Sequence, residues 1–172
     1  MAVQSVDEWQ SHPWLVLRIR SHHENVAEQS LHQKEINVYL PRHRVVRRSR
    51  QRRTALVVPL FPGYAFVQPR PDQFDTIRCV RGSCGFVLRG GKPAPMPQKQ
   101  LEALRLLAGS GVELVVNPTF TAGQRVEMIS GPFKGVQGEL IRIKSQDRLV
   151  INADLVGSCV TVEVDSAEIA IL

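Results

Sequence analysis

The densest set of charged side chains in this sequence is an arginine block between positions 42 and 53, which contains no acidic residue. Its members are Arg42, Arg44, Arg47, Arg48, Arg50, Arg52 and Arg53. Seven cations without a compensating acid repel one another in water, so a polyanionic partner is favoured over the alternative, a solvated hairpin loop. Because no aromatic residue is interleaved, the block predicts contact with a nucleic acid backbone rather than stacking on single-stranded bases.

A second candidate binding feature is the aromatic segment at positions 59–67, which reads PLFPGYAFV. Pro62 fixes its own φ and Gly63 permits a positive φ, so the turn that they form has one shape. Tyr64 and Phe66 are two residues apart in the strand expected to follow, and therefore point to the same face. Together with Phe61 they either pack in the core or form a rigid aromatic surface that anchors a partner.

Enzyme and metal signatures are absent from the sequence. The glycine-rich segment 85–92 lacks the spacing of a phosphate-binding loop, and serine, histidine and acidic residues show no triad spacing. The three cysteines, Cys79, Cys84 and Cys159, do not combine with histidines at metal-ligand separations. We therefore predict no catalytic residue, no metal and no cofactor.

Composition and charge define the class of protein further. The net charge of +6 divides unevenly, because residues 1–112 hold 17 basic and 8 acidic residues whereas residues 113–172 hold 5 and 8. The first part can therefore approach a polyanion, and the second is better suited to contact protein. No apolar run is long enough to cross a membrane, and the odd number of cysteines with no export signal predicts a cytoplasmic protein with free thiols. We expect a monomer.

Periodicity predicts two regions with different architectures. In the first, strands at 14–20, 36–40, 55–58, 64–68 and 85–88 alternate with helices at 22–35, from 71 and at 97–108. This order indicates an α+β fold, in which helices cover a small antiparallel sheet. After a break at 109–121, strands at 125–129, 136–143, 149–153 and 158–164 follow at short intervals, which is typical of a small closed β-barrel.

The motifs resemble those of NusG-type transcription elongation factors. WLVL from Trp14, VYLP at 38–41 and PLFPGY at 59–64 resemble the amino-terminal (NGN) domain, and GQRV at 123–126 with GPFKG at 131–135 resembles the KOW module. The resemblance implies an extension at 1–13, an NGN-like domain at 14–108, a linker at 109–121 and an SH3-like KOW barrel at 122–172. Within this family, the sequence resembles the specialised, operon-specific antiterminators of the RfaH type more than the housekeeping factor.

The resemblance also implies partners for the first domain. An apolar surface would bind the clamp helices of the RNA polymerase β′ subunit, and the start of the second helix would touch the β gate loop. The matching clamp-helix positions are Trp14, Phe61, Pro62, Gly63, Tyr64 and Phe66, and the matching gate-loop positions are Gln73, Phe74 and Asp75. Arg20, His22 and His23 lie where specialised members read the non-template DNA strand, and the arginine block would contact that DNA or the nascent RNA backbone.

For the KOW module, the resemblance implies recruitment of termination factor Rho or of a small-subunit ribosomal protein. The matching positions are Phe133, Lys134, Leu155 and Val156, with Phe133 and Lys134 presented at the tip of a loop. The chain would then act as an elongation or antitermination factor that suppresses pausing or termination. The alternative is a ribosome-associated KOW protein that binds RNA through its arginines.

Overall fold

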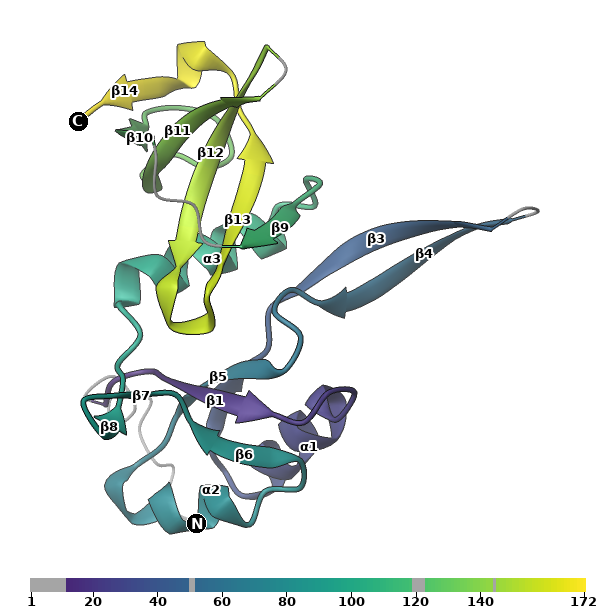
Figure 1. Ribbon diagram of the computed structural model, residues 1–172, viewed down its shortest axis with the longest axis vertical. Coiled ribbons are helices and arrows are strands. Elements are labelled where there is room, and N and C mark those ends of the chain that lie inside the picture. The colour runs from purple at the N-terminus through teal and green to yellow at the C-terminus, as the bar shows by residue number, and fades with distance from the viewer. Residues whose placement is uncertain (1–11, 50–51, 119–122, 144) are drawn as a thin grey trace, which may run out of the picture. The chain divides into compact units, whose positions relative to one another are not determined.

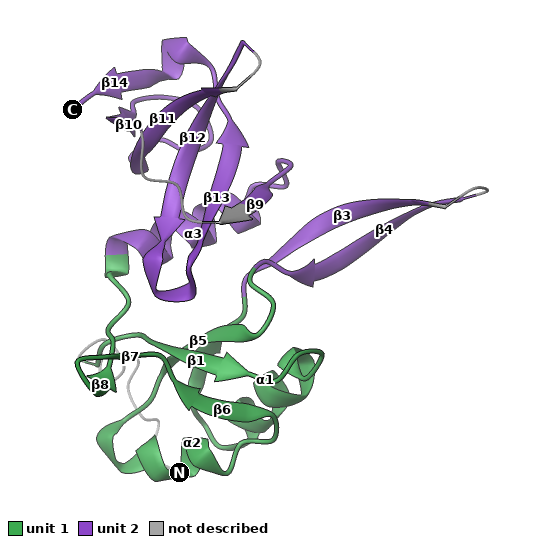
Figure 2. Ribbon diagram, viewed as in Figure 1, with its two compact units in different colours: residues 1–40, 61–98 green, residues 41–60, 99–172 purple. Residues whose placement is uncertain are grey.

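The computed structural model describes residues 12–49, 52–118, 123–143 and 145–172. The chain forms two compact units, one of residues 1–40 and 61–98 and the other of residues 41–60 and 99–172 (Figure 2). The two units are described separately below.

The first unit is built on a four-stranded antiparallel sheet with the order β2-β5-β1-β6 (Figure 1). Its strands are β1 (Leu15–Ile19), β2 (Asn37–Tyr39), β5 (Tyr64–Gln68) and β6 (Ser83–Phe86). Two helices accompany the sheet, α1 (Glu24–Gln33) and α2 (Phe74–Arg78), and the 3-10 turn η2 (Pro71–Gln73) leads into α2. A small hairpin of β7 (Leu88–Arg89) and β8 (Lys92–Pro93) completes this unit.

The core of the first unit lies on one face of this sheet. Alternate residues of β1 and β5 point to that face and pack against both helices. The cluster contains Leu15, Leu17, Ile19, Ala65 and Val67 from the strands, Ala27 and Leu31 from α1, and Ile77 from α2. Val26, which is also on α1, is outside this core and is 38% exposed.

The second unit contains the hairpin of β3 (Arg42–Ser49) and β4 (Arg52–Pro59), which pair along their full length. The arginine block is therefore mainly strand, a structure that the sequence analysis did not assign to it. Valines at 45–46 and 57–58 explain this result, because β-branched residues favour extended backbone. The predicted helix at 97–108 is confirmed as α3 (Gln98–Gly109), in which Leu101, Leu104 and Leu107 are buried.

The rest of the second unit is an antiparallel sheet with the order β14-β10-β11-β12-β13-β9. Its strands are β9 (Val115–Pro118), β10 (Gln124–Met128), β11 (Gln137–Ile143), β12 (Gln146–Ala153), β13 (Ser158–Glu163) and β14 (Ile169–Ile171), with 3-10 turns η3 (Asp154–Val156) and η4 (Ser166–Glu168) between the last three. The all-strand character predicted after residue 121 is confirmed. Along β13 the polar Thr161 is buried as well as its apolar neighbours: it is 2% exposed and donates its hydroxyl proton to the Val115 carbonyl at 3.3 Å.

Candidate partner and nucleic acid interfaces

The turn before β5 is held by two contacts to Gly63. Its N–H donates to Oε1 of Glu24 at 2.9 Å, and its carbonyl accepts from the Ile19 N–H at 2.8 Å. Gly63 has φ +84°, and a Cβ there would lie 3.4 Å from the Ile19 carbonyl oxygen. The conformation favours glycine, whereas the contact is of ordinary van der Waals length, so the fixed turn predicted from the sequence is confirmed by the positive φ.

Glu24 supports this turn, although the sequence analysis did not single it out. It is the first residue of α1, whose N-cap, His23, makes no side-chain capping bond. Glu24 is 7% exposed, and its carboxylate reaches the distant turn at Gly63. Because the two residues are 39 positions apart, no local pattern could have indicated this contact.

Two of the three predicted aromatic anchors are core residues. Phe61 is 3% exposed and Phe66 is fully buried, with their rings edge to face at a centroid distance of 6.3 Å. Tyr39, which the sequence analysis did not single out, stacks on Phe66 from the neighbouring strand, also at 6.3 Å. Of the two alternatives left open by the sequence, core packing therefore holds for both phenylalanines, because large rings gain most when removed from water.

The accessible part of the aromatic segment is smaller than predicted. Pro62 is exposed, and Tyr64 and Trp14 are partly exposed. Tyr64 pairs with Arg18 and Phe66 with Val16, so the two rings share a face as expected, and this face is opposite to the helix-covered core. Tyr64 is therefore the aromatic side chain of this segment that a partner can reach.

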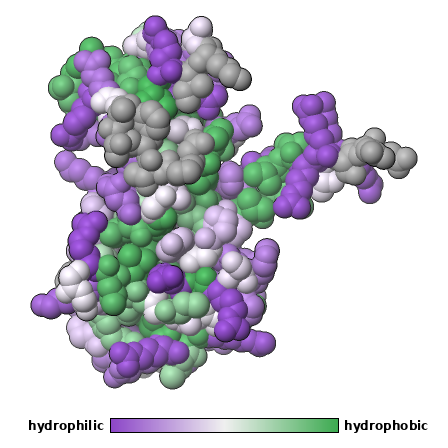
Figure 3. Space-filling view, viewed as in Figure 1, coloured by the Kyte–Doolittle hydropathy of each residue, from purple (hydrophilic) through white to green (hydrophobic). Residues whose placement is uncertain are grey.

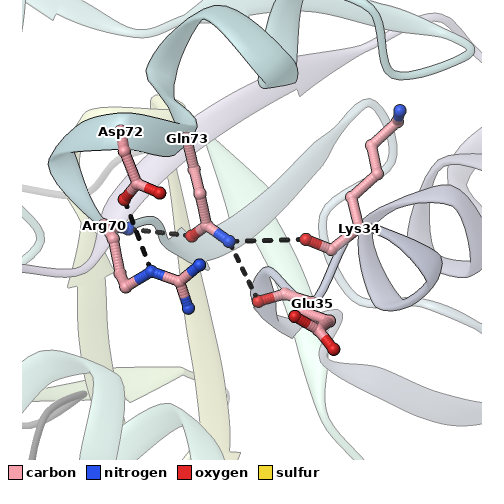
Figure 4. A network of polar contacts seen from close by, with 5 residues as sticks. All are labelled: Lys34, Glu35, Arg70, Asp72 and Gln73. Atoms are coloured by element: carbon pink, nitrogen blue, oxygen red, sulfur yellow. Dashed lines mark hydrogen bonds and ion pairs between the residues drawn. The ribbon is translucent and has the colours of Figure 1, made fainter.

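The start of α2 is tied to the end of α1 through Gln73 (Figure 4). Its Oε1 accepts from the Arg70 N–H at 3.0 Å, and its Nε2 donates to the carbonyls of Lys34 and Glu35 at 3.3 and 3.2 Å. Gln73 is 5% exposed, and both polar atoms of its amide bind backbone groups of the protein itself. Of its two neighbours in the predicted gate-loop surface, Phe74 is partly buried against the core and Asp75 is exposed.

The three residues predicted to read DNA lie together at the turn between β1 and α1. Arg20 and His22 are exposed, and His22 has φ +64°. His23 is partly buried, with Nδ1 3.0 Å from the Ser21 carbonyl oxygen. The Arg20 N–H donates to the Gly82 carbonyl at 2.8 Å, which fixes the backbone of this turn against the loop before β6.

The arginine block lies along the β3–β4 hairpin. The side chains of Arg44, Arg47, Arg48, Arg52 and Arg53 are exposed and Arg42 is partly buried, while Arg50 lies outside the described residues. In the space-filling view, apolar side chains cover the base of this ribbon and hydrophilic ones lie farther out (Figure 3). His43, at the base, has its pKa lowered by burial, an effect that a hydrogen bond with the Leu114 backbone partly offsets.

The four residues of the KOW-like region that were predicted to bind a partner separate into two groups. The turn at 131–136 is closed by hydrogen bonds from the Lys134 N–H to the Gly131 carbonyl and from the Val136 N–H to the Phe133 carbonyl. Lys134 is exposed as predicted, but Phe133 is 2% exposed and so is not presented at the tip. Val156 is also buried, and Leu155 beside it is partly exposed.

Two classes of site are not found in the described part of the chain. None of its helices is long and apolar enough to cross a lipid bilayer. No group of three or more histidine, cysteine, aspartate or glutamate side chains is arranged there to hold a metal ion.

Comparisons with known proteins point to one family. Residues 12–105 match the family model NusG, described as transcription termination factor NusG. The transcription termination/antitermination protein NusG of Streptococcus pyogenes is 25% identical over 171 residues, covering 91% of this chain and 94% of the relative. That of Thermus thermophilus is 26% identical, covering 81% and 82%. A solved structure of Thermotoga maritima NusG superposes with a TM-score of 0.55 at 22% identity, covering 94% of this chain and 97% of that one, which shows a shared fold.

Proposed function

Because this chain belongs to the NusG family of transcription termination and antitermination factors, we propose that it binds RNA polymerase during elongation and suppresses pausing or termination. The first unit would hold the polymerase, and the KOW-like region would recruit a further protein. A ligand shifts a conformational equilibrium only by its differential affinity for the two states. The protein would therefore favour the polymerase conformation in which both of its binding surfaces can be engaged.

The observation that carries the proposal is the turn at Gly63, which presents Pro62 and Tyr64 on a fixed backbone. Hydrogen bonds to Glu24 and Ile19 hold this turn, and Phe61 and Phe66 pack beneath it as a support. A rigid tyrosine with a polar tip is a typical anchor for a protein partner. We assign this surface, together with Trp14, to the clamp helices of the β′ subunit.

The second contact would involve the start of α2. Asp75 is exposed and can meet the β gate loop directly, whereas Gln73 and Phe74 would position it through their contacts with the fold. Arg20, His22 and His23 are close enough together to contact a single strand of non-template DNA. These assignments follow the role of the matching positions in the family.

In the second unit, Lys134 and Leu155 are the accessible members of the surface proposed to recruit Rho or a small-subunit ribosomal protein. Phe133 and Val156 would support that surface from below. We also propose that the protein is a specialised, operon-specific member of the family. The ribosome-associated alternative is not favoured, because the matching relatives are transcription factors.

The test is a titration of the purified protein with a peptide that spans the β′ clamp helices. Tyr64→Asp should weaken binding at least tenfold, since loss of an interface anchor costs about 2–4 kcal/mol. Tyr64→Phe is the matched control and should bind nearly as well as the wild type. Circular dichroism should show both variants folded. Equal affinity of Tyr64→Asp and wild type would contradict the assignment of this surface.

A further inference from the structure

The β3–β4 hairpin has two chemically different faces, which its register defines. Directly paired residues of an antiparallel ribbon share a face, and successive residues alternate. One face, called the arginine face, carries Arg42, Arg44, Val46, Arg48, Arg53, Ala55 and Val57. The opposite face carries His43, Val45, Arg47, Arg52, Thr54, Leu56 and Val58. The described arginines are thus divided four to two between the faces.

Most of the arginine face is open to solvent. Val46 and Val57 are 60% and 64% exposed, so its apolar centre is exposed to solvent. Among the described residues, no acidic side chain forms an ion pair with Arg44, Arg48 or Arg53. Exposed apolar surface surrounded by unpaired cations is typical of a binding surface for a polyanion that also offers apolar groups.

A hollow of about 930 Å³ lies beside this face within the second unit. Its lining includes Arg42, Arg44, Arg48 and Arg53 on the hairpin side and the segment 108–114 on the other. One acidic residue, Glu113, is in the lining. The four arginines that the register places on one face therefore also border one concave space.

We propose that the arginine face binds double-stranded DNA, with the ribbon in the major groove and the guanidinium groups on the flanking phosphates. A two-stranded β-ribbon fits the major groove of B-form DNA, where exposed thymine methyl groups can contact the valines. Arg44 and Arg48 are four residues apart on one strand, or ~13 Å, which matches the rise of about four base pairs. The hollow gives one sugar–phosphate strand a place beside the ribbon.

The composition of the face favours duplex DNA over other nucleic acids. Sites for single strands combine positive charge with aromatic side chains on which bases stack, and the arginine face has no phenylalanine, tyrosine or tryptophan. The major groove of A-form RNA is too deep and narrow for side chains to read. The proposal goes beyond polymerase binding and is independent of it, because DNA can be tested with the purified protein alone.

Fluorescence anisotropy with a labelled 20-base-pair DNA duplex, at several salt concentrations, tests the proposal. Arg44→Gln/Arg48→Gln removes two charges from the arginine face, and Arg47→Gln/Arg52→Gln removes two from the opposite face. The first variant should lose at least tenfold in affinity at low salt, and its log–log salt dependence should be shallower by about 2. The second should lose no more than about twofold. Circular dichroism establishes that both variants are folded.

Three outcomes would overturn the proposal. Equal losses in the two double variants would show that only the net charge matters. Tighter binding of the single strand of the same sequence would show that the duplex is not the ligand. Tighter binding of a duplex RNA of the same sequence would exclude the major groove of B-form DNA as the site.

Discussion

The aromatic turn of the first unit and the arginine hairpin of the second both contain side chains that are common in interfaces, but the fold uses them differently. At the turn, Phe61 and Phe66 are buried and support the backbone, and Tyr64 alone of the three rings is partly exposed. On the hairpin, five arginines are exposed along two strands that pair over their full length. Burial in the core stabilises an aromatic ring, so folding competes with partner binding for such side chains. An arginine without an ion-pair partner gains nothing from burial and therefore stays available for binding.

The largest effect that sharpens this comparison should come from the buried ring. Phe66→Ala removes a fully buried side chain that contacts Phe61 and Tyr39, so it should lower the free energy of unfolding by about 3–5 kcal/mol. Tyr64→Ala, two residues away and partly exposed, should cost about 1 kcal/mol. Urea denaturation measures both values. Similar losses of stability at the two positions would contradict the view that Phe66 supports the fold and Tyr64 is available to a partner.

A smaller effect should come from the hydrogen bond that fixes the turn. Glu24→Ala leaves the Gly63 N–H without its acceptor and should cost about 1–3 kcal/mol of stability. Glu24→Gln keeps an oxygen in place and should cost less. Thermal denaturation of the two variants compares them, and clamp-helix binding by folded Glu24→Ala should weaken because Tyr64 loses its fixed position. Unchanged stability in Glu24→Ala would mean that this contact does not hold the turn.

The smallest effect should be seen on the hairpin. Arg44→Gln/Arg48→Gln should change the free energy of unfolding by no more than about 0.5 kcal/mol, because exposed side chains without ion pairs add little to stability. The same variant should lose DNA affinity, so stability and binding would separate at this surface. A large destabilisation would show that the arginines are part of the fold.

Local patterns predicted most of the elements in this chain. The strand at 14–20, the helix at 97–108 and the strands after residue 121 follow from periodicity and from their bounding glycines and prolines. Contacts between distant residues were not predictable in this way. Glu24 reaches Gly63, Tyr39 stacks on Phe66, and Gln73 binds carbonyls at the end of α1, and each depends on strand or helix placement that only the whole fold defines.

The candidate sites were predicted unevenly for the same reason. The residue types indicated where the turn and the arginine-rich segment lie in the sequence. They did not indicate which face of a strand is buried by other elements of the fold. Phe133 and Val156 belong to this class of error, since both are buried although their loops are at the surface. The exposed arginines were easier to predict, because burying an unpaired charge is costly whereas burying an aromatic ring is favourable.

The unbroken pairing of β3 with β4 also determines how this hairpin can change in length. Two residues added to each strand would extend the ribbon and leave every outer side chain on its original side. One residue added to each strand near the base would move every outer side chain to the other face. Arg48 and Arg53 would then lie on the face that carries His43 and Val58 at the base. Insertions in even steps are thus the ones that such an arm can tolerate while keeping its binding chemistry.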